Sequence, residues 1–156
     1  VSSRYPVAVT LALAAPYDMP KDPKMKFLRP ISWVKPLIPR DGNESEWFDH
    51  ESEAVHVCYD ADPVKGALQL KEMLGVMQKE LSNLANPILL IYSKNDQTVR
   101  FDEKHMDLVY DNVSSEIKET LVLEGTGHVL TRDAKRDQVF EACAVFLRRM
   151  EEKYTA

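Results

Sequence analysis

Cysteines, long apolar runs and excess positive charge are all scarce in this sequence. Its two cysteines, Cys58 and Cys143, are too few for a disulfide framework, and neither stands in a Cys-x-x-Cys pair that could hold a metal. We therefore expect a reducing, cytoplasmic location and no metal or other cofactor. No apolar run approaches the roughly 20 residues of a membrane span, and a net charge of −5 argues against a nucleic-acid partner.

The length and composition are those of a globular protein. With 156 residues, of which 44% are hydrophobic and 29% charged, the chain is one domain or part of one. It is long enough to build a core without disulfides. It has no initiator methionine and enters an apolar run at Val7, so we expect the sequence to start in the middle of a fold.

Three short apolar runs are typical of β-strands. They are Val7–Ala14, Ile88–Ile91 and Thr120–Leu123. Because Val7–Ala14 is apolar at almost every position, it predicts a strand buried on both faces, as in a parallel sheet; its alanines leave a helix as the competing interpretation. Nothing else in the chain can cover its far side, so we expect further strands to belong there and the sheet edge to be exposed without them.

Helical spacing fills the intervals between these runs. The expected helices extend from Asp62 to about Leu84, from Asp102 to about Asp111, and from about Asp133 onward. Their first residues are the expected N-caps, with Thr131 as an alternative for the last. Strands that alternate with amphipathic helices predict the α/β class, here with three parallel strands and flanking helices. The positions expected to face the core are Ala67, Leu70, Leu74, Met77, Leu81, Met106, Val109, Val139, Cys143, Phe146 and Met150.

An irregular, proline-rich stretch covers about residues 17–63. A span of this length with little periodicity is usually functional or an excursion from the main domain. We expect a cap-like insertion with short helices at best; a loop packed on the surface is the alternative. Four aromatic residues in it predict either an apolar pocket wall or core packing: Phe27, Trp33, Trp47 and Phe48.

Two polar side chains follow the second and third apolar runs. Asp96 comes after Ile88–Ile91, and His128 comes after Thr120–Leu123 on a loop that contains Gly125 and Gly127. Ligands and chemistry gather at the carboxyl ends of parallel strands. A carboxylate there can orient an imidazole and stabilise its protonated form, so the pair makes two thirds of a hydrolytic triad. Taken singly, Asp96 could equally be a turn residue and His128 a loop histidine bonded to backbone.

The other histidines do not suggest a metal site. No second histidine or cysteine stands at ligand spacing from His128, and His105 lies on a different expected helix. His50 and His56 fall in the irregular stretch, where we expect structural or surface roles.

Combined, these segments resemble the carboxyl-terminal part of the α/β-hydrolase fold, in which the chain order is nucleophile, acid, histidine. The closest resemblance is to carboxylesterases of the monoacylglycerol-lipase-like kind, in the segments Pro87–Val99, Gly125–Asp133 and Arg136–Phe140. It is strong between Val64 and Phe146, and it extends to Tyr5–Pro16 as the strand that follows the nucleophile helix.

The resemblance implies a serine esterase or lipase-like hydrolase that acts on a small-molecule carboxylic ester. It implies that Asp96 is the triad acid and His128 the general base. It also implies a small cap over the pocket, contributed by residues after Pro16. The sequence assigns no substrate-binding residues.

The nucleophile that this family requires is missing from the chain. None of the five glycines belongs to a Gly-x-Ser-x-Gly motif, and the residues that donate to the oxyanion are absent with it. Ser2 and Ser3 lack flanking glycines, so we interpret them as the tail of the helix after the nucleophile. The motif is expected about ten to twenty residues before Val1. We predict that this chain alone has no significant esterase activity.

Two further readings remain open at the level of sequence. The chain could be a non-catalytic, truncated hydrolase module that acts in binding, or that assembles with an amino-terminal half or a second copy through the sheet edge. The same fold with a cysteine or aspartate nucleophile would leave these residues looking much the same.

Overall fold

A computed structural model describes residues 2–20, 27–39 and 45–155 of the chain. Its centre is a three-stranded parallel sheet in the order β1-β4-β5, formed by β1 (Thr10–Leu13), β4 (Ile88–Ser93) and β5 (Lys118–Leu123). The register pairs Leu13 with Ile91 and Ser93 with Leu123, so the carboxyl ends of β4 and β5 lie level. The predicted α/β class and the three parallel strands are confirmed.

β4 is the central strand, and all six of its residues are buried. Its side chains alternate between two apolar clusters because successive residues of a strand point to opposite faces. Leu89 and Ile91 pack with residues of the carboxyl-terminal helix, whereas Ile88, Leu90 and Tyr92 pack toward the other face. A continuous apolar run is what a strand covered on both sides requires.

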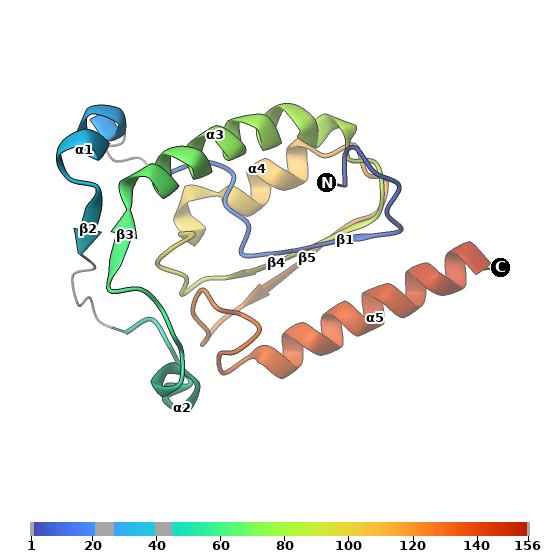
Figure 1. Cartoon of the computed structure of the whole chain (residues 1–156). Coiled ribbons are helices and arrows are strands. Elements are labelled where there is room, and N and C mark those ends of the chain that lie inside the picture. Colours follow the sequence, from blue (N-terminus) through green and yellow to red (C-terminus); the bar gives the residue numbers. More distant parts are fainter. Residues whose placement is uncertain (1, 21–26, 40–44, 156) are drawn as a thin grey trace.

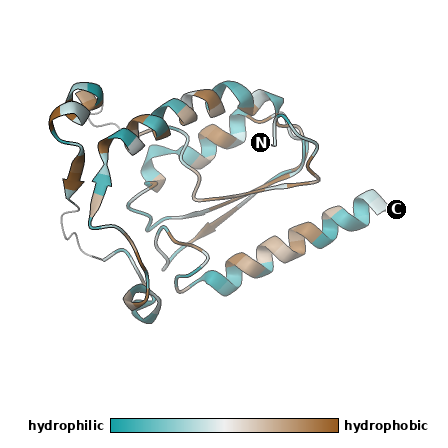
Figure 2. Cartoon of the chain, viewed as in Figure 1, coloured by the Kyte–Doolittle hydropathy of each residue, from teal (hydrophilic) through white to brown (hydrophobic). Residues whose placement is uncertain are grey.

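Helices cover both faces of the sheet (Figure 1). α5 (Arg136–Thr155) lies on one face, and α3 (Val64–Glu80) and α4 (His105–Asn112) lie on the other. Figure 2 shows hydrophobic residues concentrated in the middle of α5 and hydrophilic ones toward its ends. The buried residues of α5 are Val139, Phe146 and Met150, as expected, and Cys143 packs beside them.

β1 forms where the first strand was expected, but it is shorter and only half-buried. Full burial on both faces was therefore a wrong expectation for this chain. The physical reason is its place in the sheet: β1 pairs with β4 on one side, and within the described residues no strand pairs with its other side. Ser2 to Arg4 form a turn rather than the end of a helix, and Arg4 pairs with Glu80 of α3 at 2.8 Å.

The expected helix caps were misplaced. Asp62 belongs to the three-residue strand β3 (Ala61–Pro63), so α3 begins at Val64 with no side-chain cap. Asp102 lies in a 3-10 turn (Phe101–Glu103) and pairs with Arg100; α4 begins only after Lys104, which has a left-handed φ of 59°. Asp62 is taken into the pairing of β3 with Leu37–Pro39, and Asp102 is paired with a neighbour two residues away, so neither caps its helix.

The stretch expected as a cap-like insertion is described over residues 17–20, 27–39 and 45–63. It contains two short helices, α1 (Leu28–Val34) and α2 (His50–Ala54), as expected. It also contains a small antiparallel ribbon that was not expected, in which β2 (Leu37–Pro39) pairs with β3. These elements lie together beside the sheet, away from the carboxyl end of α5 (Figure 1).

Helix α3 offers a direct test of which positions stabilise the fold. Leu74 is 2% exposed, whereas Leu70, one turn earlier and also expected in the core, is 37% exposed. We expect Leu74→Ala to lower the free energy of unfolding by about 2–5 kcal/mol, and Leu70→Ala to lower it by less than about 1 kcal/mol. Both variants lose the same side chain from the same helix. The free energy of unfolding is measured by urea unfolding followed by circular dichroism. If both variants lose the same amount, Leu74 is not more tightly packed than Leu70.

Candidate active site

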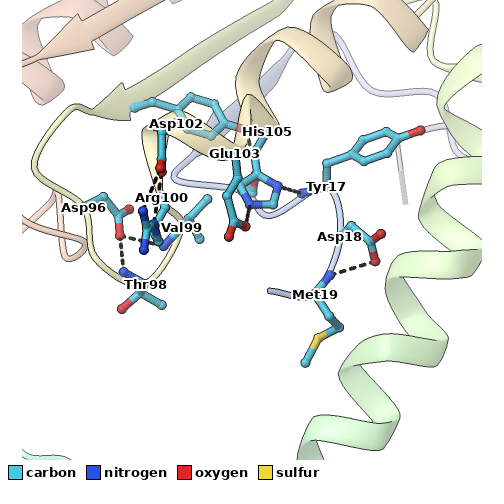
Figure 3. Close-up of polar contacts among 12 residues, drawn as sticks. Tyr17, Asp18, Met19, Asp96, Thr98, Val99, Arg100, Asp102, Glu103 and His105 are labelled. Carbon is cyan, nitrogen blue, oxygen red and sulfur yellow. Dashed lines mark hydrogen bonds and ion pairs between the residues drawn. The ribbon is translucent and has the colours of Figure 1, made fainter. Parts of the chain in front are cut away.

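Asp96 lies three residues beyond the end of β4, in a tight turn. Its Oδ1 accepts hydrogen bonds from the backbone N–H groups of Thr98 at 2.8 Å and Val99 at 2.7 Å (Figure 3). The residue is 2% exposed. Two backbone donors fix the plane of the buried carboxylate, and Oδ2 is left to point at another group.

That other group is the imidazole of His128. Nδ1 of His128 lies 2.9 Å from Oδ2 of Asp96. When Nδ1 carries the proton and donates it to the carboxylate, Nε2 holds a lone pair and can accept a proton. The His128 side chain is 33% exposed, and no group in the described part of the chain bonds to Nε2. The arrangement can therefore work as an oriented base.

The two loops that carry this pair are joined by backbone and side-chain hydrogen bonds. Asn95 accepts from the N–H of Gly125 at 2.8 Å, and the hydroxyl of Ser93 donates to the carbonyl of Thr126. Gly125 has a φ of 72°, a left-handed conformation that glycine adopts without steric cost. The glycine after β5 therefore turns the chain back toward the end of β4.

The environment of His128 favours its protonated form. The hydrogen bond to Asp96 raises the pKa of His128 above its ordinary value; burial lowers it, and the charges of Asp96 and Glu46 raise it further. The net result is a raised pKa. A general base must be neutral to accept a proton, so any activity that depends on His128 should rise with pH through this pKa.

This shift predicts a pH dependence that can be measured on the chain itself. The titration midpoint of His128, followed by NMR, should lie above the ordinary 6.5, and Asp96→Asn should lower it. Because the pKa is raised in the folded state, the stabilisation it provides is complete below about 6.5 and is lost as the pH rises through the folded pKa. The resonance is assigned to His128 by its absence from the spectrum of His128→Gln. A titration midpoint of His128 at or below 6.5 would contradict the prediction.

The other three histidines contact residues other than Asp96 and His128. His105 is buried: Nδ1 accepts from the N–H of Tyr17 at 3.1 Å, and Nε2 lies 3.0 Å from Glu103 (Figure 3). It joins the chain after β1 to the start of α4. His50 pairs with Glu53 at 3.0 Å near the surface. Within the described ranges, no group of three or more histidine, cysteine, aspartate or glutamate side chains is arranged to hold a metal.

The aromatic residues of the insertion are mostly in solvent. Trp33 is 84% exposed and Phe27 is 61% exposed, so neither packs in the core of this chain. Trp47 is half-buried, with its ring centroid 4.9 Å from that of His56. Their expected place in a pocket wall stays a prediction.

Sequence reasoning missed the second buried carboxylate at this end of the sheet. Asp133 was expected as the N-cap of the terminal helix, but α5 begins three residues later at Arg136, and Asp133 is 1% exposed. Its partners include Phe48 and Asp49, which lie 85 and 84 residues away in the sequence. No local pattern could have indicated contacts over that distance.

Known proteins share this arrangement of strands and helices. No protein-family model matches the chain. A carboxylesterase of Bacillus subtilis (strain 168) is 18% identical over 146 residues, which are 94% of this chain and 56% of that protein. Among solved structures, one from a study of the metagenome-derived lipolytic enzymes LipS and LipT superposes with a TM-score of 0.77 at 26% identity, covering 91% of this chain and 55% of the other. The chain has the α/β-hydrolase fold.

A second α/β-hydrolase structure supports the same assignment. The monoacylglycerol lipase of Paleococcus ferrophilus gives a TM-score of 0.71 at 12% identity, covering 92% of this chain and 60% of that one. This chain thus spans little more than half the length of the proteins it matches. It fits the carboxyl-terminal part of the α/β-hydrolase fold, the part to which the sequence resemblance pointed. Cys58 and Cys143 are free, and no described helix is long and apolar enough to cross a membrane.

Proposed function

We propose that the chain supplies the acid, Asp96, and the general base, His128, of a carboxylic ester hydrolase whose nucleophilic serine lies outside these 156 residues. One observation carries the proposal: Nδ1 of His128 lies 2.9 Å from a buried carboxylate whose other oxygen is held by two backbone donors. The similarity to lipolytic enzymes supports esters as the substrate class.

The geometry suits both halves of an acyl-transfer cycle. Nε2 of His128 takes the proton from the serine hydroxyl while the serine oxygen bonds to the ester carbonyl carbon. Asp96 keeps the imidazole in the required tautomer and stabilises the imidazolium that forms. Nε2 then gives the proton to the departing alkoxide, so the carbon–oxygen bond breaks and an alcohol leaves. A water molecule repeats the sequence on the acyl-enzyme, which releases the acid and restores the serine.

The insertion over residues 17–63 is proposed as the cap over the ester-binding pocket. Its segment at residues 46–49 already lies against both loops of the candidate site, through Glu46 to the turn after Asp96 and through Phe48 and Asp49 to Asp133. A cap in that position would border the open side of His128. The exposed aromatic residues Phe27 and Trp33 would then be available to contact the acyl chain of a substrate.

The test uses the complete protein. Its gene should encode Gly-x-Ser-x-Gly shortly before Val1, and the product should hydrolyse p-nitrophenyl esters in a manner that requires Asp96 and His128. Unchanged rates after His128→Ala and Asp96→Asn would remove the proposal, even if the serine motif were present.

A second candidate function is assembly without catalysis, and it is favoured by the edge of β1, with which no strand of the described residues pairs. Beside that edge lies an apolar groove with a volume of about 410 Å³, away from His128, between the amino-terminal turn and α3. Unpaired edges invite association. In this alternative a partner chain supplies the missing strands. The residues that line this groove include Thr10, Ala12, Met73, Val76 and Met77. Light scattering tests this alternative: a monodisperse monomer that stays folded on its own would count against a required partner.

A further inference from the structure

The segment Glu46–Asp49 of the insertion is attached to the loop that carries His128. The attachment runs through Asp133, five residues after the histidine, whose Oδ1 accepts from the N–H groups of Phe48 at 2.9 Å and Asp49 at 2.7 Å. Its Oδ2 accepts from the N–H of Gly127, the residue immediately before His128. One buried carboxylate therefore holds two stretches of backbone that are far apart in the sequence.

The carboxylate of Asp133 accepts four hydrogen bonds from backbone N–H groups. A fourth backbone N–H, from Ala134, bonds to Oδ1 at 2.8 Å. Burial alone would raise the pKa of Asp133, but the four backbone donors hold it below its usual value. Hydrogen bonds to an ionised acceptor are about twice as strong as neutral ones. Asp133 is thus an ionised anchor next to the base rather than a helix cap.

Gly127 makes the close approach of the two backbones possible. A Cβ atom at this position would lie 2.3 Å from the carbonyl oxygen of Glu46, which is far inside van der Waals contact. The requirement is for space, because Gly127 does not have a positive φ. Any side chain here would push residue 46 away from the histidine loop.

The same segment also contacts the turn that carries the acid. Oε2 of Glu46 accepts from the N–H of Gln97 at 2.9 Å, and Oε1 accepts from the hydroxyl of Thr98 at 3.1 Å. Thr98 is one of the two residues whose N–H groups hold Asp96. Glu46–Asp49 therefore bridges the two loops from outside the sheet.

We propose that Glu46–Asp49 is a clamp that fixes the distance between the Asp96 turn and the His128 loop, with Asp133 and Gly127 as its positioning residues. The inference rests on the proposed function for its catalytic meaning, but the clamp itself is a property of this chain. An oriented acid–base pair tolerates little displacement, since a shift of about 1 Å at a reacting group can cost about a hundredfold in rate. Loosening the clamp should therefore loosen the hydrogen bond between His128 and Asp96.

The experiment follows the proton on Nδ1 of His128 by proton NMR in the full 156-residue chain. A proton held by a carboxylate resonates at low field and exchanges slowly with water; His128→Gln assigns it. Gly127→Ala and Asp133→Asn are each expected to abolish this resonance. Gly75→Ala is the matched control because a Cβ at Gly75 would meet nothing within 4 Å. Retention of the resonance at its original position in both variants would overturn the clamp.

A milder variant keeps the test decisive if either of these fails to fold. Glu46→Ala removes only the two bonds to Gln97 and Thr98, near the surface. It should leave the resonance visible but speed its exchange at least about tenfold, because the loss of a single hydrogen bond to a charged group already corresponds to about that factor. Glu51→Ala, an exposed glutamate in α2, is the control. Equal exchange rates in the two variants would also overturn the clamp.

The two proposals fail in different ways. If the unmodified, folded chain shows no low-field proton from His128, the acid–base contact itself is absent and the proposed function falls. If the proton is present and indifferent to Gly127, Asp133 and Glu46, only the clamp falls.

Discussion

Replacing His128 by alanine in the complete protein is expected to lower kcat for p-nitrophenyl butyrate by about 10⁶-fold, with little change in KM. Without Nε2 nothing removes the proton from the serine hydroxyl, and the remaining rate comes from substrate binding and the oxyanion donors. Asp96→Asn is expected to cost about 10⁴-fold, because the amide can hold the imidazole in the wrong tautomer and cannot stabilise its positive charge.

Matched substitutions separate this prediction from a general loss of structure. His50, whose side chain is 78% exposed, and Asp102, 66% exposed, provide the controls His50→Ala and Asp102→Asn. Both should keep rates within a few-fold of the unmodified protein. If they reduce kcat as much as the changes at His128 and Asp96, the catalytic assignment is wrong. If His128→Ala lowers only the melting temperature, the histidine is structural.

The isolated chain is expected to hydrolyse the same ester at the uncatalysed background rate. In a serine hydrolase the loss of the nucleophile alone costs about six orders of magnitude, and these 156 residues contain no Gly-x-Ser-x-Gly motif. The oxyanion donors associated with that motif are absent as well, so little rate enhancement should survive.

The measurement compares initial rates of the chain and of its His128→Ala variant at equal concentration. The two rates should coincide with buffer alone, and intact-mass analysis should show no acyl adduct. Turnover above background that disappears with His128 would mean that another nucleophile in the chain works with this histidine. In that case the alternative of a different nucleophile type would replace the serine.

The local order of residues made the two strand ends predictable. The apolar runs Ile88–Ile91 and Thr120–Leu123 are short and followed by polar or glycine-containing turns, and parallel strands bring such turns to one edge. That was enough to place Asp96 and His128 near one another, and the structure has them in contact at 2.9 Å. Their catalytic roles remain predictions.

Helix boundaries were less predictable because capping residues have other possible partners. Asp62 and Asp102 match the preference for acidic N-caps, yet one lies in a strand and the other pairs with a neighbouring arginine. Leu70 fits the apolar spacing of α3, yet it is 37% exposed, whereas Leu74 on the same face is buried. Local propensity is a weak preference that long-range contacts override.

By itself the sequence determined the class of fold, the order of the three strands of the main sheet and of the helices between them, and the two residues that follow neighbouring strands. These follow from the period of apolar residues and from turn chemistry, which act over a few residues. Only the tertiary structure decided that Asp133 and Gly127 hold residues 46–49 against the histidine loop. That attachment depends on backbone N–H groups of Phe48 and Asp49 that meet a carboxylate more than 80 residues away, and backbone donors leave no trace in the pattern of side chains.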